Sequence, residues 1–215
     1  MVQKSRAKRG RPRAYVPEDA LSRVMDVFWD NGFAATSLDD LSAATGMNRP
    51  SLYAAFGDKR ALYRKALDAY RALSRIQMKD ALAPERPLRE ALARFYEIAI
   101  SIYSSTGEKG ARGCFAIGTA LTEATTDSEI RAELAQSLHR LDETLDARIR
   151  LGQQRGEFDA DANPAQLGQI ASAMLYLLAI QARAGETHKT LRSTMDAALD
   201  TIFASTNTSK RKPSR

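Results

Sequence analysis

The chain has 215 residues, of which 44% are hydrophobic and 27% charged, so it contains enough apolar material for one large or two small folded domains. Its single cysteine, Cys114, excludes an intrachain disulfide and suits a reducing compartment. No run of eighteen apolar residues is present, and no apolar segment follows the basic N-terminus as in a signal peptide. We therefore expect a cytoplasmic protein without a membrane span.

The net charge of +6 is concentrated at the two ends of the chain. Residues 1–13 carry six basic and no acidic side chains, and residues 205–215 carry four basic and no acidic ones. Because neither end shows hydrophobic periodicity, we expect a disordered basic arm over residues 1–16 and a disordered basic tail over 205–215. A basic arm can contact the DNA backbone or minor groove; the alternative, which we favour for the tail, is a solvated segment.

Hydrophobic periodicity predicts an all-α fold of about nine helices. The first helix is expected to run from Pro17 to Gly32 and to bury Phe28. In the long fourth helix, the buried apolar stripe is expected to extend through Leu73 to Ile76. The later helices are expected at residues 58–82, 87–105, 114–124, 127–155, 163–184 and 187–204.

The segment between the fifth and sixth helices is rich in glycine. Gly107, Gly110 and Gly113 all lie within residues 104–113, which are expected to form a mobile loop. No segment of the chain alternates convincingly between apolar and polar residues, so we expect no sheet.

Residues 36–56 predict two short helices joined by a tight turn. Ser37 can cap the first helix, with the Asp40 side chain reaching back to the backbone of the cap. Gly46 is expected to end that helix, and Asn48 to cap the next one. This arrangement is typical of a helix-turn-helix unit, whose second helix enters the DNA major groove.

The side chains left on the outer face of this unit are candidate DNA contacts. Arg49 can bind O6 and N7 of a guanine, or alternatively a phosphate alone. Ser51 can donate to a base or a phosphate, and Ala54 can touch a thymine methyl group. Thr36 and Ser37, together with the free N–H groups of the first helix, are predicted to form a phosphate seat.

The surroundings of this unit carry a resemblance to a known family. The matching stretches are FWDNGF at 28–33, TS at 36–37, GM at 46–47, LYAAF at 52–56 and DKRAL at 58–62. Residues 20–63 thus resemble the N-terminal domain of TetR-type transcriptional repressors. The resemblance implies that Tyr53 contacts a phosphate, and it favours a phosphate contact over simple solvation for Lys59. The predicted DNA-binding residues are Thr36, Ser37, Asn48, Arg49, Pro50, Ser51, Tyr53, Ala54 and Lys59.

The resemblance also implies a division of the chain into two domains, namely a DNA-binding domain at 17–63 and a ligand-binding and dimerisation domain at 64–204. It implies a homodimer built through the eighth and ninth helices. Independently, the helix at 163–184 is apolar on more than one face, which requires burial on more than one side. The alternative is burial within one subunit.

A pocket for a small-molecule effector inside the second domain is likewise implied by the resemblance. For each candidate lining residue, ordinary core packing is the alternative. The candidates are Tyr96, Tyr103, Cys114, Phe115, Glu123, Tyr176 and Gln181.

The sequence offers no catalytic or metal-binding set. Cys114, His139 and His188 are too few for a zinc site, and no motif ties the thiol to a histidine base. We therefore expect no catalytic residue, no metal and no cofactor. Cys114 follows Arg112 at an expected helix start, which would suit a redox sensor, but a buried small hydrophobic residue is the favoured alternative.

These observations predict a sequence-specific DNA-binding transcriptional regulator, most simply a repressor released from a palindromic operator by a small-molecule effector. One alternative is an architectural DNA-binding protein without effector control, which would show little sequence preference. Another is an all-α enzyme or ligand carrier that retains a vestigial helix-turn-helix.

Overall fold

The computed structural model describes residues 17–108, 110–158 and 161–204, so the predicted basic arm and tail lie outside the described residues. Within these ranges the chain forms nine α-helices and one short hairpin, which confirms the predicted all-α class. The helices are α1 (Pro17–Ala35), α2 (Leu38–Thr45), α3 (Arg49–Phe56), α4 (Lys59–Ala81), α5 (Leu88–Tyr103), α6 (Phe115–Glu123), α7 (Ser128–Gln154), α8 (Pro164–Arg183) and α9 (His188–Ala204).

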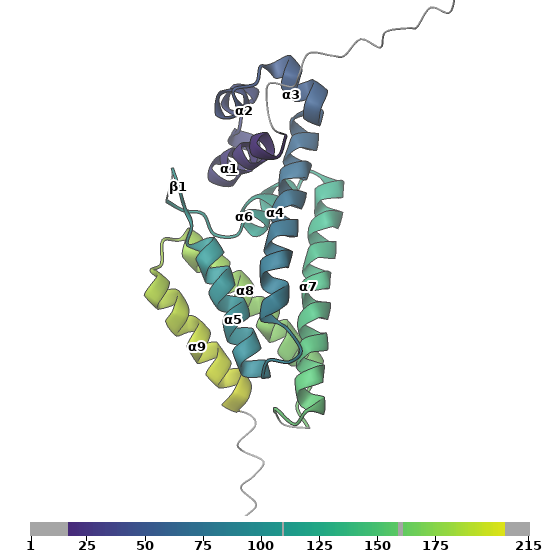
Figure 1. Cartoon of the computed structure of the whole chain (residues 1–215), viewed down its shortest axis with the longest axis vertical. Coiled ribbons are helices and arrows are strands. Elements are labelled where there is room, and N and C mark those ends of the chain that lie inside the picture. The colour runs from purple at the N-terminus through teal and green to yellow at the C-terminus, as the bar shows by residue number, and fades with distance from the viewer. Residues whose placement is uncertain (1–16, 109, 159–160, 205–215) are drawn as a thin grey trace, which may run out of the picture.

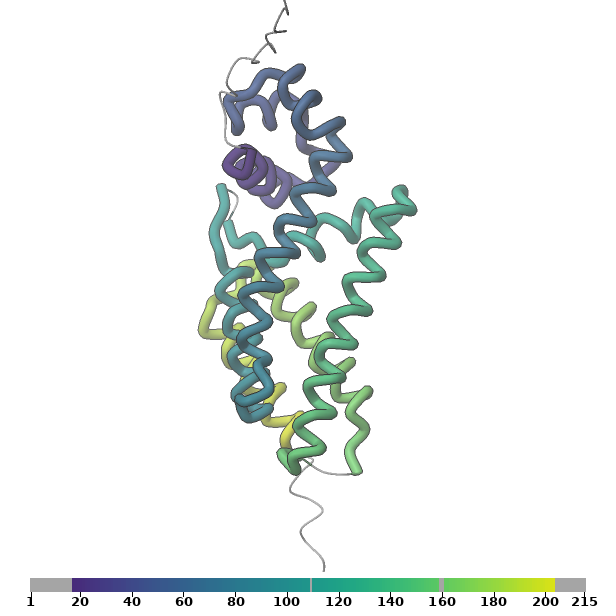
Figure 2. Tube along the Cα trace, turned by 45° about the vertical axis from the view of Figure 1, so that its right-hand side comes forward, coloured from purple at the N-terminus to yellow at the C-terminus, as the bar shows by residue number. Residues whose placement is uncertain are grey.

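The helices are arranged as a small end unit on a longer bundle. Helices α1, α2 and α3 gather at one end of the molecule, and α4 runs from there down into the bundle formed with α5, α7, α8 and α9 (Figure 1). Figure 2 shows α4 as the long connection between the two parts. Helix α8 is central to the bundle, because it packs against α5, α7 and α9.

Helix α1 is interrupted where the sequence predicts its end. Gly32 has φ of +78° and ψ of 172°, a conformation that a glycine adopts without the steric cost of a side chain. Val24 and Phe28 on the preceding turns are fully buried, which confirms the predicted burial of Phe28. A short helical segment follows Gly32, so that α1 as a whole reaches Ala35.

The predicted burial of Leu73 and Ile76 on α4 is wrong. Leu73 is 55% exposed and Ile76 is 72% exposed. The buried face of α4 lies instead over its first three turns, from Leu62 to Tyr70, where α1 and α6 pack against it. Farther along, α4 packs mainly against α5. Leu73 and Ile76 have the helical spacing of a buried stripe, but none of the described helices covers their side of α4.

The prediction that the chain has no sheet is also wrong in one place. Strand β1 (Thr106–Gly107) pairs antiparallel with β2 (Gly110–Ala111), within the predicted glycine-rich loop. Two-residue strands are too short to show an alternating pattern. A side chain at position 107 would displace the Asp30 carboxylate and the Arg112 guanidinium group, because an added Cβ atom would overlap both. The hairpin is therefore seated against α1.

An aromatic cluster joins the end unit to the bundle. The Trp29 ring of α1 lies 5.0 Å from the Tyr70 ring of α4 and 5.8 Å from the Phe115 ring of α6, measured between centroids. Tyr63 packs edge-on against Phe28 and Phe115. Such pairs add stabilisation beyond the burial of their area. The end unit and the bundle thus share one continuous hydrophobic core.

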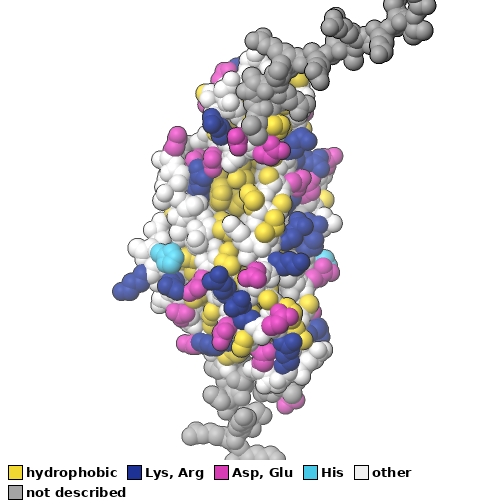
Figure 3. All heavy atoms as spheres, in the orientation of Figure 1, with side chains coloured by type: hydrophobic (Ala, Val, Ile, Leu, Met, Phe, Trp, Pro, Cys, Tyr) yellow, Lys and Arg dark blue, Asp and Glu magenta, His cyan; other side chains and the backbone are white. Residues whose placement is uncertain are grey.

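The surface is not uniformly polar. Figure 3 shows apolar side chains gathered at mid-height, below the α1–α3 end, with charged side chains of both signs around them. Among the described helices, α8 has the length and mean hydropathy of a membrane span. Because its buried face packs against α5, α7 and α9, these properties are also those of a core helix in a bundle.

Candidate DNA interface and effector pocket

The caps predicted for the helix-turn-helix unit are confirmed. The Ser37 hydroxyl accepts a hydrogen bond from the Asp40 amide at 3.1 Å, and the Asp40 carboxylate accepts one from the Ser37 amide at 2.7 Å. Gly46 closes α2 in the left-handed conformation, with φ of +69°. The Asn48 side chain accepts a hydrogen bond from the Ser51 amide at 2.9 Å, which fixes the start of α3.

Burial decides which face of α3 points outward. Leu41 of α2, Leu52 and Phe56 of α3 and Met47 of the turn are all buried in the hydrophobic core. The opposite face of α3 is open to solvent at the far end of the molecule (Figure 1). Its exposed residues are Asn48, Arg49, Pro50, Tyr53 and Ala54, all predicted DNA contacts, with Ser51 half-buried beside them.

Arg49 is held in place by an acidic residue of α2. Its Nε donates to Oδ1 of Asp39 at 2.9 Å and its Nη2 to Oδ2 at 2.5 Å. The hydrogen bond and the charge of Asp39 raise the pKa of Arg49. Both side chains are more than half exposed, so solvent screens the pair. The Nε and Nη2 edge also suits guanine, so reading a base requires Arg49 to exchange Asp39 for that base.

The predicted phosphate seat at the start of α2 is not formed by free hydroxyl groups. Thr36 is 1% exposed, and its hydroxyl donates to the carbonyl of Gly32 at 2.6 Å. The Ser37 hydroxyl donates to the Asp40 carboxylate at 2.7 Å. The first turn of α2 also carries the negative charges of Asp39 and Asp40, which repel a phosphate. Sequence cannot show that the Thr36 hydroxyl faces the preceding turn.

Lys59 lies at the start of α4 and reaches the turn that follows α1. Its Nζ is 3.5 Å from the carbonyl oxygen of Ala34 and 4.5 Å from the centroid of the Phe33 ring. These contacts hold the ammonium group at the end of the molecule that carries α3. A phosphate contact by Lys59 stays a prediction.

Arg112 makes a contact that the sequence did not predict. From the end of the hairpin it binds Asp30 of α1 through Nε and Nη2, at 2.9 and 3.0 Å, and Asp26 through Nη1 at 2.6 Å. Desolvation lowers the pKa of Arg112, but the hydrogen bonds to Asp30 and Asp26 outweigh it, and the pKa is raised. The spacing of the two aspartates, four residues apart on one helix face, could have indicated a shared cation.

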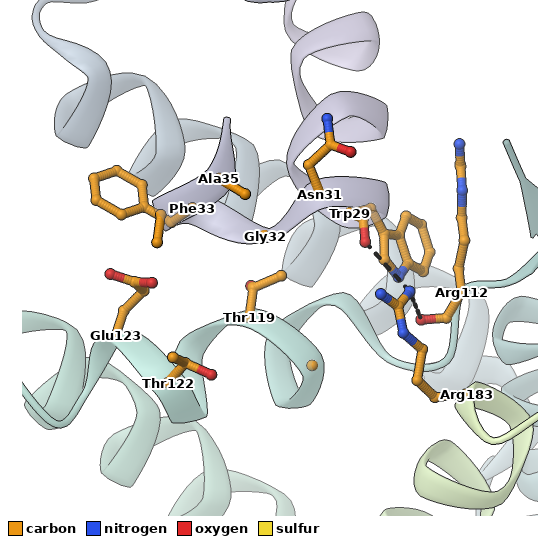
Figure 4. A pocket seen from close by; sticks show the side chains of 12 residues that line it. Trp29, Asn31, Gly32, Phe33, Ala35, Arg112, Thr119, Thr122, Glu123 and Arg183 are labelled. Carbon is orange, nitrogen blue, oxygen red and sulfur yellow. Dashed lines mark hydrogen bonds between the residues drawn. The ribbon is translucent and has the colours of Figure 1, made fainter. Parts of the chain in front are cut away.

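A small pocket lies next to this contact, between the end of α1 and α6 (Figure 4). Arg183 of α8 closes one side, because its Nη1 donates to the carbonyls of Trp29 and Arg112 at 3.5 and 3.2 Å. Glu123, a predicted effector contact, lines this pocket, which has a volume of about 220 Å³. That volume is below the range of sites for drug-sized ligands.

A larger pocket of about 550 Å³ lies between α4 and α7. Its buried lining residues, which we call its inner end, are Tyr70 of α4, Tyr103 of α5, Cys114 and Leu175 of α8. Tyr103 and Cys114 were predicted to line an effector site. The sequence did not indicate the other lining residues, which are Tyr70, Arg71, Ser74, Arg75, Met78, Ser137, Arg140, Leu141, Glu143 and Thr144.

The remaining predicted effector residues lie elsewhere. Tyr96 is fully buried and donates to the carbonyl of Ala171 at 2.9 Å. Phe115 is fully buried in the aromatic cluster. Tyr176 and Gln181 on α8 do not line the larger pocket. Tyr96 and Phe115 are therefore ordinary core residues, which is the alternative given for them above.

Three side chains at the inner end of the larger pocket interact. The Tyr70 hydroxyl donates to Sγ of Cys114 at 3.4 Å. Burial first, and then the neighbouring Cys114, raise the pKa values of Tyr70 and Tyr103 well above the ordinary tyrosine value. Both phenols are therefore neutral at physiological pH. Cys114 is 8% exposed, and the nearby Arg112 is paired with aspartates of α1, so the structure agrees with the favoured interpretation of Cys114 as a buried small hydrophobic residue.

Comparison with known proteins agrees with this architecture. A family model for bacterial regulatory proteins of the tetR family matches residues 21–66, and one for the tetracyclin repressor-like C-terminal domain matches residues 89–198. The HTH-type transcriptional repressor ComR of Escherichia coli strain K12 is 32% identical over 181 residues, which cover 82% of this chain and 84% of that protein. The chain belongs to the TetR family of transcriptional regulators.

Two further relatives agree with this family membership. The HTH-type transcriptional repressor BdcR of the same Escherichia coli strain is 38% identical over 108 residues, or 50% of this chain and 54% of that protein. A cysteine-substituted variant of the TetR family regulator CifR, solved with 26-base-pair operator DNA, has a TM-score of 0.80 and 31% identity. The alignment covers 88% of this chain and 98% of that one. The predicted function as a DNA-binding transcriptional regulator is thereby confirmed.

The charge of this TetR regulator is unfavourable to DNA in the helical part of its binding domain. Residues 17–63 carry seven acidic and four basic side chains, a formal charge of −3. Residues 1–16, outside the described residues, carry six basic and no acidic side chains. Phosphate neutralisation provides the sequence-independent part of DNA affinity. The segment that precedes α1 in sequence carries more basic side chains than residues 17–63 do.

Proposed function

We propose that this TetR regulator is a cytoplasmic homodimeric repressor that reads a palindromic operator with α3 and is released by a small molecule bound between α4 and α7. The observation that carries the proposal is the outward face of α3 in a chain that matches the operator-bound CifR variant over 88% of its length. Residues 17–63 would then bind DNA, and residues 64–204 would bind the effector and the second subunit.

The outer face of α8 supports the dimer. Ile170, Leu177 and Ile180 are 51%, 40% and 58% exposed, and their spacing of seven and three residues puts them on one side of the helix. Leu175 and Leu178, on the other side, are buried inside the subunit. An apolar row exposed along a long helix is typical of a protein interface.

Helix α9 offers a complementary surface next to this row. Between α8 and α9 runs a shallow groove lined almost entirely by small side chains, which allow the helices of a second subunit to approach closely. Its residues are Met174, Thr190, Ser193, Thr194, Ala197, Ala198 and Thr201. A two-fold dimer through α8 and α9 would present two copies of α3 to half-sites about 34–36 Å apart.

The connections of the larger pocket support control by an effector. Tyr103 and Cys114 lie at its inner end, and between them in sequence is the hairpin from which Arg112 binds α1. Tyr70 and Arg71 are wall residues on α4, the helix that leads directly to α3. A ligand lowers DNA affinity only by binding better to a conformation that binds DNA less well.

The dimer is tested by placing a charge on the outer face of α8. Leu177→Glu is expected to convert the dimer to a monomer in sedimentation velocity and to abolish tight operator binding, because a single subunit reads one half-site. Ile76→Glu on α4 is the matched control, since Ile76 is also apolar and 72% exposed. A dimer that survives Leu177→Glu, or a wild-type monomer that binds an operator tightly, would contradict the proposed assembly.

A further inference from the structure

We propose that the effector is a small organic acid whose carboxylate is bound by Arg71, while its uncharged part lies against Tyr103, Cys114 and Leu175. The inference rests on the proposed effector role of the pocket between α4 and α7, and it names the chemical class of ligand that this pocket takes.

Arg71 has hydrogen-bonding capacity that the described residues leave unused. Its side chain is 14% exposed. Nη1 lies 3.4 Å from Asp68 and 3.5 Å from Glu133, whereas Nε and Nη2 are shielded from solvent and have no hydrogen-bond partner among the described residues. A shielded charged donor without an acceptor is costly, and it calls for a partner. Of the shielded, unpartnered side-chain atoms, only these two belong to a wall of the larger pocket within the described ranges.

Two other arginines show what this edge of the side chain binds. Arg49 grips both oxygens of Asp39 through Nε and Nη2, and Arg112 grips both oxygens of Asp30 through the same pair of atoms. The planar fork of a guanidinium group matches the two oxygens of a carboxylate. Arg71 presents the same fork, so a carboxylate is the group that it fits.

The present contacts of Arg71 leave it free to turn toward a ligand. Its distances to Asp68 and Glu133 are longer than the 2.5 Å between Arg64 and Glu133, so Glu133 is held mainly by Arg64. Rotation of the guanidinium group toward the pocket would therefore break only long contacts. The Nε and Nη2 edge would then face the ligand.

The remaining charges at the pocket favour an anion. Arg75 on α4 and Arg140 on α7 line opposite walls, and neither forms an ion pair with a described residue. Glu143 is the acidic side chain among the lining residues, and it lies 3.2 Å from Nε2 of His139. Clustered positive charge beside a low-dielectric wall raises the local concentration of anions.

The inner end of the pocket suits an uncharged, apolar group. Tyr70 and Tyr103 are neutral phenols there, and Leu175 adds apolar surface. Met78 adds further apolar surface to the α4 wall. The volume of about 550 Å³ lies within the usual range for small-molecule sites. An acid group on an aliphatic or arylalkyl body therefore matches the pocket from its mouth to its inner end.

Matched acids and amides test the inference. Octanoate, 4-phenylbutyrate and 6-phenylhexanoate would each be compared with its primary amide by isothermal titration calorimetry on the full-length protein. We expect at least one acid to bind about tenfold more tightly than its amide, since an ion pair is replaced by a neutral contact. Trp29, the single tryptophan, lies 5.0 Å from the Tyr70 ring and gives an independent fluorescence signal.

Variants assign the preference to Arg71. Arg71→Gln is expected to weaken binding of the acid about tenfold and to leave the amide unchanged. Arg71→Lys retains the charge without the fork and should recover only part of the affinity, which protects the test against a folding defect in the first variant. Arg94→Gln on α5 is the control, because Arg94 is exposed and does not line the pocket.

Three results would overturn the inference: equal affinity for acids and amides, equal losses for both in Arg71→Gln, or no binding by any acid in the series. Fluorescence anisotropy on operator DNA distinguishes a failure of the acid class from a failure of the proposed effector role. If the amides bind and release DNA, the effector role stands and the acid class fails. If acids bind through Arg71 without changing DNA affinity, the acid class stands and the effector role fails.

Discussion

Arg112 and Asp30 form a two-point ion pair across the boundary between the bundle and α1, with N–O distances of 2.9 and 3.0 Å. Their side chains are 15% and 10% exposed, so solvent screens the pair little. Because Arg112 lies on the segment between Tyr103 and Cys114, the pair links the wall of the larger pocket to α1, the helix on which α2 packs.

Removing Arg112 should therefore weaken the packing of α1 against the bundle and destabilise the protein. Arg112→Ala leaves Asp30 shielded without its cation, and we expect a loss of about 2 kcal/mol in the free energy of unfolding. This corresponds to a fall of about 5 °C in Tm by calorimetry for a chain of this size. Arg112→Lys should recover only part of the loss, because lysine lacks the fork.

A double-mutant cycle with Asp30→Asn distinguishes the free energy of the Arg112–Asp30 interaction from other effects of each substitution on stability. The two substitutions should be less than additive, since each removes the same interaction. Full additivity would show that Arg112 stabilises the protein by other means, such as its stacking on Trp29.

Asp39 should restrain the DNA affinity of α3. Asp39→Asn removes a negative charge from the interface and releases Arg49, so we expect affinity for all duplexes to rise several-fold at low salt.

Arg49→Ala should instead relax base preference at one position in each half-site. Anisotropy titrations on single-base operator variants measure both effects. Asp196→Asn on the exposed face of α9 is the control, and a uniform loss over all sequences in Arg49→Ala would refute base reading by this residue.

The N-terminal segment should dominate the salt dependence of binding. Deletion of residues 1–13 removes six basic side chains. The negative slope of log K against log salt concentration should become less steep, by up to about five units. Deletion of residues 205–215 removes four basic side chains at the other end and should leave the slope unchanged. An unchanged slope after the N-terminal deletion would assign the phosphate contacts to the helices alone.

Tyr63, a buried tyrosine of the aromatic cluster, should limit stability at high pH. Burial raises the pKa of Tyr63 to about 12, while its hydroxyl is hydrogen-bonded to Thr119 at 2.7 Å. The folded state therefore keeps the proton when the unfolded state loses it. The stability contribution is complete below about pH 10 and falls by about 1.4 kcal/mol per pH unit between pH 10 and 12.

Denaturant unfolding of Tyr63→Phe across this range measures the contribution. The variant should show a shallower decline above pH 10 than the wild type, although its stability at neutral pH falls with the lost hydrogen bond. Tyr53→Phe, at the half-exposed position on α3, should follow the wild-type curve. Parallel curves for wild type and Tyr63→Phe would contradict the assignment to this residue.

Local signals explain which features were predictable from sequence. Ser37, Gly46 and Asn48 act on residues three or four positions away, so their roles as caps follow from spacing alone. Arg112 and Asp30 are 82 residues apart, and no local pattern indicates that the hairpin meets α1. Leu73 has the spacing of a buried residue, yet its burial depends on whether another helix covers it.

The two candidate sites differ in the same way. The outward face of α3 was predictable, because it is the complement of a short apolar seam on one helix. The pocket between α4 and α7 draws its walls from helices far apart in sequence. Tyr103 was found as an aromatic residue near a stripe, whereas Arg71 resembles any surface arginine until its surroundings are known.

Sequence-specific DNA binding through α3 can be measured by selecting binding sites for the full-length protein from random duplex DNA at near-physiological salt. We expect enrichment of a palindrome whose half-sites are centred about one helical turn apart, or a multiple of it, as a two-fold pair of α3 helices requires. Binding without any enriched sequence would contradict sequence reading by α3 and favour an architectural protein. No binding even at low salt would show that α1, α2 and α3 do not form a DNA-binding unit.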